Sequence, residues 1–245
     1  MSTRVLLVLA ITSFATVAFA AEEGAFAKAN QAYAEGRFGA AAAHYESLIN
    51  SGTWNANLFY DLGNAQYRLG DFGQAILNYE RALALEPRHP EAEANLQLAR
   101  DEARALELRR DPIERYASFG TVKQYTIAAV IAFWFAVFLV THVFFARRRS
   151  GGRIALIALS LIVSAVSIFA IVTLENGTRG NALAVVTGKQ VQARFATADT
   201  AKAILLLPAG SEVKILSERG GWLYVALPND QRGWIPTNSA ERVRL

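Results

Sequence analysis

The chain contains no cysteine and only three histidines, His44, His89 and His142. The absence of cysteine excludes disulfides, thiolate metal sites, a cysteine nucleophile and a lipid anchor attached to cysteine. The sequence also lacks a His-x-x-x-His pair, a nucleophile elbow, a phosphate-binding glycine loop and a dinucleotide-binding fingerprint. We therefore expect a protein that is not an enzyme and that has no catalytic residue, no cofactor and no metal site.

Charged residues are scarce, at 19%, whereas 53% of the residues are hydrophobic and the mean hydropathy is +0.20. Two 21-residue runs, 125–145 and 154–174, contain no Asp, Glu, Lys or Arg. About 20 apolar helical residues cross the hydrocarbon core of a bilayer, so each run is long enough to form a transmembrane helix. The alternative is a helical hairpin buried inside a soluble domain.

The segment 146–153 between these runs carries four arginines and no acid, which predicts a cytoplasmic loop by the positive-inside rule. Residues 1–20 are typical of a signal peptide, with Arg4 before an apolar stretch and Ala18-Phe19-Ala20 as a cleavage pattern. The alternative is an uncleaved signal anchor. Together these features predict a two-pass protein of a bacterial inner membrane with both flanking regions in the periplasm. The net charge of +4 reflects the arginine loop, so we expect the lipid bilayer, and not nucleic acid, as a partner.

Residues that recur 34 positions apart reveal an internal repeat in the N-terminal part of the chain. The pairs are Asn30 and Asn64, Tyr33 and Tyr67, Gly36 and Gly70, Phe38 and Phe72, Ala41 and Ala75, and Tyr45 and Tyr79. Each unit, 22–55 and 56–89, is predicted to form two helices joined by a turn at its glycine. A helix over 90–110 is expected to cap the array, because a repeat buries its apolar face only against a neighbour. These segments predict a helical module over 21–110.

The second unit resembles a tetratricopeptide repeat. The matching residues are Leu62-Gly63, Tyr67, Gly70-Asp71-Phe72, Ala75, Ala82 and Pro87, with Phe59 in place of the usual tryptophan. The resemblance implies an all-α module that binds proteins on a concave face lined by the first helix of each unit. The candidate protein-binding residues that it places there are Phe26, Asn30, Tyr33, Tyr60, Asn64 and Tyr67. Amides can pair with a peptide backbone and tyrosines offer flat contact area; the alternative is that Tyr33 and Tyr67 pack between helices.

Beyond residue 183 the hydrophobic pattern changes to short runs typical of β-strands, separated by turn-forming segments such as Pro208-Ala209-Gly210 and Arg219-Gly220-Gly221. Residues 184–245 resemble a bacterial SH3 domain, chiefly in the segments 207–210, 221–225 and 232–236, which implies a small all-β barrel. Its candidate ligand-binding residues are Trp222, Tyr224 and Trp234. They would form an aromatic groove, and the alternative is that they fill the core. The segments 111–124 and 175–183 are expected to be linkers.

The order of these modules resembles the BatE-type membrane proteins of the Bacteroides aerotolerance operons. The resemblance implies a multidomain fold with an all-α tetratricopeptide repeat module, two transmembrane helices and an SH3-like barrel. It also implies partners such as von Willebrand factor A-type membrane proteins of the same operon, and a role in stress tolerance or envelope integrity. The expected function is a non-enzymatic scaffold or adaptor. Two alternatives are a cell-wall-binding or sensing protein whose barrel contacts peptidoglycan, and a non-catalytic subunit of an envelope enzyme complex.

Overall fold

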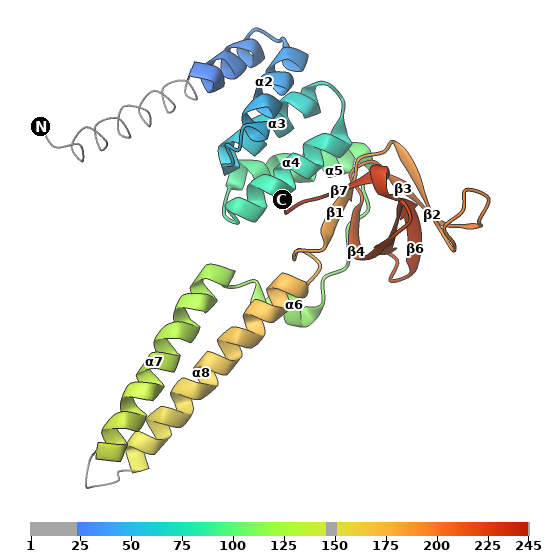
Figure 1. Ribbon diagram of the computed structural model, residues 1–245. Helices are drawn as coiled ribbons and strands as arrows, with labels where there is room; N and C mark the ends of the chain where they lie inside the picture. Colours follow the sequence, from blue (N-terminus) through green and yellow to red (C-terminus); the bar gives the residue numbers. More distant parts are fainter. Residues whose placement is uncertain (1–23, 146–150, 245) are drawn as a thin grey trace, which may run out of the picture.

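The structure is a computed structural model that describes residues 24–145 and 151–244 (Figure 1). The signal peptide predicted at 1–20 and most of the loop predicted at 146–153 lie outside these residues. A helical module and an antiparallel β-sheet lie side by side and form a head, from which a long helical hairpin projects (Figure 1). This architecture confirms a multidomain chain with a helical part, two long apolar helices and a β part.

Within the described residues, the helical module consists of five helices. They cover residues 24–34, Phe38–Asn50 (α2), Ala56–Arg68 (α3), Phe72–Leu85 (α4) and Pro90–Ala103 (α5). The side chains of Asn55 and Asp71 cap α3 and α4 by accepting a hydrogen bond from the third following backbone N–H. Gly36 and Gly70 in the two turns share a φ of +76°, a conformation that glycine adopts without steric cost. The helix–turn–helix units therefore lie where the 34-residue period placed them.

Small residues allow the paired helices to approach each other closely. Ala41 and Ala75 are fully buried, as expected from their place in the repeat. A Cβ atom at Gly63 of α3 would lie 2.7 Å from the ring of Tyr79 in α4 and 3.3 Å from the carbonyl oxygen of Ala75. The contact between α3 and α4 therefore has no room for a side chain at Gly63.

The capping helix α5 ends at Ala103, so the prediction that it extends to Arg110 is wrong. Arg104 adopts a left-handed conformation, with a φ of 50°, and terminates the helix. The next residues pair with the β-sheet instead: the backbone N–H of Leu106 donates to Ser211 Oγ (3.1 Å), and the carbonyl of Leu106 accepts from the N–H of Glu212 (2.8 Å). Leu106 then packs on the core of the sheet, and Leu108 is buried against the helices.

The C-terminal part folds into a seven-stranded antiparallel sheet in the order β3-β2-β6-β5-β4-β1-β7. The strands are Leu183–Val186 (β1), Gln190–Arg194 (β2), Ala203–Pro208 (β3), Glu212–Arg219 (β4), Trp222–Ala226 (β5), Arg232–Pro236 (β6) and Ala240–Arg242 (β7), with a 3-10 turn at Thr237–Ser239 before β7. Its core is formed by alternate residues of the strands, including Val213, Leu223, Val225 and Ile235. The predicted linker 175–183 is shorter than expected because β1 begins at Leu183.

The helical module and the sheet share a hydrophobic core. Ile76 and Leu77 of α4 are buried in the same cluster as Leu183 and Val185 of β1 and Val243 near the end of the chain. All five side chains are almost completely inaccessible. Burial of one such side chain stabilises a fold by about 1.5–3 kcal/mol, so this contact is a substantial part of the head. The helical module and the sheet therefore pack against each other, although the sequence places two long helices and two predicted linkers between them.

A buried ionic cluster joins the same two parts. Arg100 of α5 forms ion pairs with Glu80 of α4 (2.6 Å), with Glu107 (3.2 Å) and with Glu212 at the start of β4. Arg100, Glu80 and Glu212 are each only 3% exposed. The second carboxylate oxygen of Glu212 accepts a hydrogen bond from the backbone N–H of Leu108 at 3.0 Å. Burial, followed by the nearby carboxylate of Glu80, raises the pKa of Glu212, and Arg100 opposes this shift.

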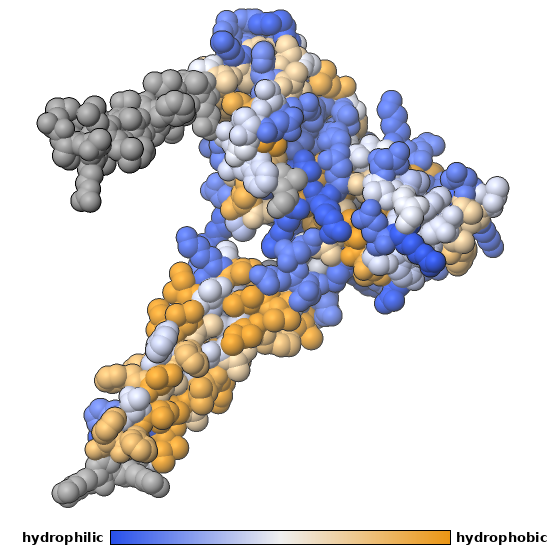
Figure 2. All heavy atoms as spheres, in the orientation of Figure 1, coloured by the Kyte–Doolittle hydropathy of each residue, from blue (hydrophilic) through white to orange (hydrophobic). Residues whose placement is uncertain are grey.

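The hairpin consists of α7 (Val122–Phe145) and α8 (Gly151–Asn176), both longer than the predicted spans. The buried sides of the two helices consist of small residues, namely Ala129, Ala132, Ala136, Ser160, Ser164, Ser167 and Ala170. Such residues allow close helix contact in a bilayer. The outer sides are apolar and exposed (Figure 2), and only 17% and 22% of the most apolar stretches are buried. Both helices are long and apolar enough to cross a membrane, and they are too exposed to resemble the core helices of a soluble domain.

Side-chain contacts fix the hairpin to the head. The predicted linker 111–124 contains a short helix, Pro112–Ala117 (α6), and the first residues of α7. Glu114 of α6 is buried, and its Oε1 accepts hydrogen bonds from the hydroxyl of Thr178 (2.8 Å) and the backbone N–H of Arg179 (3.2 Å), just after α8. On the side of the sheet, the amine of Lys214 donates to the carbonyl of Asn176. The linkers are thus ordered and hold the hairpin in place.

Candidate functional site

In tetratricopeptide repeats the first helix of each unit is expected to line a concave face, and in this chain these helices are the helix at 24–34, α3 and α5. The 34-residue register places Leu98 of α5 in line with Asn30 and Asn64, and Asn95 in line with Asp61. The sheet contacts the array through α4 and through Arg100 of α5, whereas Asn30 and Leu98 remain exposed. The concave face is therefore accessible to a partner.

The two asparagines make the same contact in both repeats. The buried hydroxyl of Tyr45 donates to Asn30 Oδ1 (2.7 Å), and that of Tyr79 donates to Asn64 Oδ1 (2.8 Å). Burial raises the pKa of both tyrosines. The amide oxygens are therefore already used inside each repeat, which the sequence did not indicate. Within the described parts of the chain, the Nδ2 groups of Asn30 and Asn64 have no acceptor, and Asn30 is exposed whereas Asn64 is half-buried.

Aromatic residues of the concave face pack within their own repeats. Tyr33 and Tyr67 meet Phe38 and Phe72 edge-on, with ring centroids 5.2 and 5.4 Å apart. Both tyrosines are nevertheless half-buried and not enclosed. Phe26 lies 6.0 Å from Tyr45 in the first unit. The rings thus combine a packing role with an accessible flat surface.

Two polar residues of this face were missed from the sequence. Asn95 of α5 donates to Asn64 Oδ1 (2.8 Å) and to the hydroxyl of Tyr60 (3.3 Å), and so links the cap to the second repeat. Asp61 of α3 is half-buried, and burial raises its pKa to about 6. The 34-residue register would have found both, because it places Asp61 and Asn95 in equivalent positions. Among the described residues, no group of three or more His, Asp and Glu side chains could hold a metal ion.

Replacing Asp61 with asparagine is expected to stabilise the fold at neutral pH. The folded-state pKa of about 6 lies above the ordinary value of 3.8, so the folded protein binds this proton more tightly than the unfolded chain. Stability therefore falls as the pH rises from about 4 to about 6, by roughly 1 kcal/mol for a carboxyl that is still partly hydrated. Urea unfolding of the full chain in detergent micelles between pH 4 and pH 7 measures this slope. An unchanged slope in Asp61→Asn would contradict the assignment.

The aromatic residues of the sheet form a surface on the side away from its core. The antiparallel register pairs Tyr224 of β5 with Trp234 of β6, and their ring centroids lie 4.9 Å apart. Trp222 lies two residues before Tyr224 and points to the same side, and all three are half-buried. The residues between them along the strands are the ones buried in the core of the sheet. The three aromatics therefore provide a flat surface rather than core packing.

Comparison with known proteins bears on the repeats alone. The family described as Tetratricopeptide repeat matches residues 56–89, which are the second unit as delimited by the 34-residue period. No curated protein matches the chain significantly. The matched segment contains α3, α4 and the turn at Gly70, so the helix pair and the family agree. Residues 56–89 are therefore a tetratricopeptide repeat. Repeats of this family bind proteins, which indicates a role in protein–protein interaction.

Proposed function

We propose that the protein is a membrane-anchored, non-enzymatic adaptor that binds an extended segment of another protein on the concave face of its repeats. The observation that carries this proposal is the open concave face. The β-sheet occupies the side of α4, whereas Asn30 and Leu98 are exposed. The unpaired Nδ2 groups of Asn30 and Asn64 suit backbone carbonyls, and Tyr33 and Tyr67 suit the side chains between them.

Acidic residues favour a partner segment that contains lysine or arginine. Residues 22–100 carry ten acidic and six basic side chains. Asp61 is half-buried, and burial disfavours its charged form. A cation bound nearby would lower the pKa of Asp61 and offset the cost of burying its charge. Asp101, which the register aligns with Tyr67, adds an exposed carboxylate at the far end of this face.

The α7–α8 hairpin is the proposed membrane anchor. The arginines of 146–153 and the signal-peptide pattern at 1–20 favour a head in the periplasm of a bacterium. The order of modules favours a Bat-type assembly for stress tolerance or envelope integrity, with von Willebrand factor A-type membrane proteins as the class of partner. A second candidate function rests on the neighbouring rings of Tyr224 and Trp234, which suit the flat face of a sugar ring such as those of peptidoglycan.

Leu98→Arg tests the concave face. Leu98 is 49% exposed, so the fold is expected to tolerate the change, whereas a bulky cation there blocks the face and repels a basic segment. Leu216→Arg is the matched control, because Leu216 of β4 is 41% exposed and lies in the sheet. The measurement is affinity capture of the intact protein from detergent-solubilised membranes, followed by titration of the captured partner. We expect Leu98→Arg to weaken binding at least about tenfold, as for a central interface residue.

Binding data that do not depend on Leu98 would favour the second candidate function. Binding that survives Leu98→Arg in a protein with an unchanged circular dichroism spectrum contradicts the concave-face proposal. Binding that is then lost on Tyr224→Ala, together with retention of muropeptides by the original chain, favours the second function. Circular dichroism of each variant separates a blocked surface from a damaged fold.

A further inference from the structure

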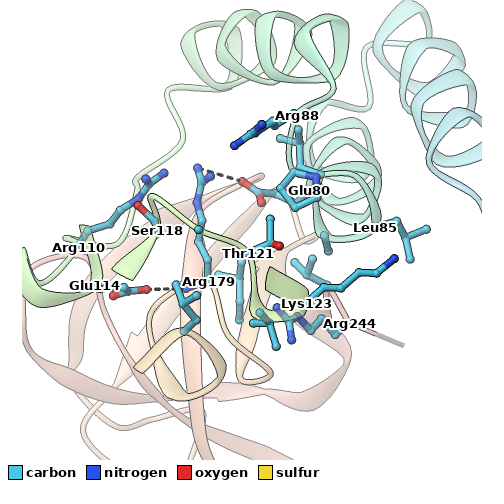
Figure 3. A pocket seen from close by; sticks show the side chains of 18 of the residues that line it. Glu80, Leu85, Arg88, Arg110, Glu114, Ser118, Thr121, Lys123, Arg179 and Arg244 are labelled. Atoms are coloured by element: carbon cyan, nitrogen blue, oxygen red, sulfur yellow. Dashed lines mark hydrogen bonds and ion pairs between the residues drawn. The ribbon is translucent and has the colours of Figure 1, made fainter. Parts of the chain in front are cut away.

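A cavity of about 480 Å³ lies at the junction between the head and the hairpin (Figure 3). Its walls come from the end of α4, the loop before α7, the first residues of α7, the end of α8 and the C-terminal segment. In the space-filling view, hydrophilic side chains gather at this junction, directly above the apolar hairpin (Figure 2). The volume lies within the range of small-molecule sites.

Positive charge dominates the lining. The basic residues are Arg88, Arg110, Lys123, Arg179 and Arg244, and the acidic residues are Glu80 and Glu114. Both acids are engaged within the protein, since Glu80 pairs with Arg100 and with Arg179 (3.8 Å), and Glu114 accepts hydrogen bonds from Thr178 and Arg179. The lining therefore carries more cations than its acids can neutralise.

Two of these cations lie close enough to repel each other. Burial, followed by the charge of Arg179, lowers the pKa of Arg110. Figure 3 shows both side chains on the same side of the cavity. A bound anion would relieve this repulsion, and a guanidinium fork suits phosphate oxygens in particular.

Apolar residues border the same cavity near the hairpin, including Leu85, Phe119, Val122 and Leu174. Phe119 is 78% exposed and lies in the loop between α6 and α7. A small soluble anion would not contact these apolar side chains. A lipid would contact both parts of the cavity, because its headgroup is charged and its chains are apolar.

We propose that this cavity binds the phosphate headgroup of an anionic phospholipid, whose acyl chains lie along the start of α7 and the end of α8. The site depends on the membrane anchoring proposed above. With the head outside the cytoplasm, the positive-inside rule predicts few lysines and arginines at this boundary. Arg110, Lys123 and Arg179 are nevertheless concentrated there. Recognition of a headgroup accounts for them, as basic pockets beside membrane helices bind anionic lipids.

The test compares phosphatidylglycerol with phosphatidylcholine. The full chain, purified in a mild detergent, is mixed with each lipid, and the bound lipid is counted by native mass spectrometry. We expect preferential retention of phosphatidylglycerol. The double variant Arg110→Gln with Lys123→Gln should lower its affinity at least about tenfold, because two charge-assisted contacts are lost. Lys202→Gln with Arg219→Gln removes the same charge from exposed residues of the sheet and should leave binding unchanged.

Several outcomes would overturn the lipid site. One is that the original chain and the double variant Arg110→Gln with Lys123→Gln bind phosphatidylglycerol equally and have the same melting temperature. Equal retention of phosphatidylcholine is another. Full displacement of phosphatidylglycerol by glycerol 3-phosphate would assign the cavity to a soluble phosphate compound. Alkaline carbonate extraction tests the anchoring separately: release of the chain from membranes contradicts the anchor, whereas a retained chain that binds no phosphatidylglycerol contradicts the lipid site alone.

Discussion

Arg100→Met is expected to destabilise the head by about 3–5 kcal/mol, because it removes the cation that two buried carboxylates share. Glu80 and Glu212 lie on α4 and β4, so their mutual repulsion would push the repeats and the sheet apart. Methionine keeps most of the volume of the side chain, and the loss therefore reports on charge. Chemical unfolding of the full chain in detergent micelles, followed by tryptophan fluorescence, measures the change in the free energy of unfolding.

Arg109→Met is the matched control, since Arg109 is exposed in the segment that follows α5 and its replacement should change stability by less than about 0.5 kcal/mol. The pH dependence gives a second check. The pKa of Glu212 is already raised, and the loss of Arg100 removes an influence that lowers it. A carboxyl with a raised folded-state pKa contributes stability at acid pH that is lost as the pH rises. The deficit of Arg100→Met should therefore shrink from pH 7 to pH 5, and a constant deficit would argue against the ionic account.

Gly210→Ala is expected to destabilise the same interface by about 2–5 kcal/mol. Gly210 has a φ of +85°, which costs other residues about 1–2 kcal/mol. A Cβ atom there would also overlap Ile76 Cδ1 of α4, and overpacking adds about 1–3 kcal/mol. Chemical unfolding of the full chain in detergent micelles measures the total change in the free energy of unfolding. Increased proteolysis of the segment 104–110 would show that the sheet has separated from the helices.

Gly220→Ala isolates the two contributions. Gly220 also has a positive φ, of 55°, and nothing lies within 4 Å of the position of its Cβ, so only the backbone cost of about 1–2 kcal/mol applies. Ile76→Val removes the methyl group that Gly210→Ala would meet, and should make that substitution less costly in the double variant. Equal losses in Gly210→Ala and Gly220→Ala would mean that the contact with α4 contributes nothing.

The regular parts of the fold could be predicted because their signals are local. The 34-residue period located Gly36 and Gly70, and both occupy the left-handed turns between paired helices. The two uncharged runs located α7 and α8. The alternating residues around Trp222 and Trp234 indicated strands whose neighbours are buried. In each case the residues that define the element lie within a few turns or strands of one another.

The contact between the repeats and the sheet could not be predicted, because its residues are far apart in the sequence and ordinary in type. Glu80, Arg100 and Glu212 are charged residues of the kind found on helix and strand surfaces, and the last two are 112 positions apart. Leu106 and Leu108 lie in the segment 90–110, which the sequence predicted as one capping helix. Their spacing of two residues is instead that of a chain that pairs with a strand.

The hydrogen bonds on the concave face could not be predicted from the sequence either. The repeat identified Asn30 and Asn64 as equivalent, but equivalence does not reveal a hydrogen-bond partner. The structure shows that Tyr45 and Tyr79, also equivalent, already donate to them. Replacing these asparagines would therefore leave two buried hydroxyls unsatisfied and would damage the fold as well as the surface. Leu98 is a cleaner target for that reason.

The attachment of the head through Glu114 and Lys214 has a further consequence for how partners meet. With the hairpin anchored in a bilayer as proposed above, these contacts hold the head, and with it the concave face, at one height and one tilt above the membrane. A partner anchored in the same membrane searches in two dimensions, and little orientational freedom remains to be lost at contact. Encounters between the two embedded proteins should thus succeed more often than titrations with soluble fragments would suggest.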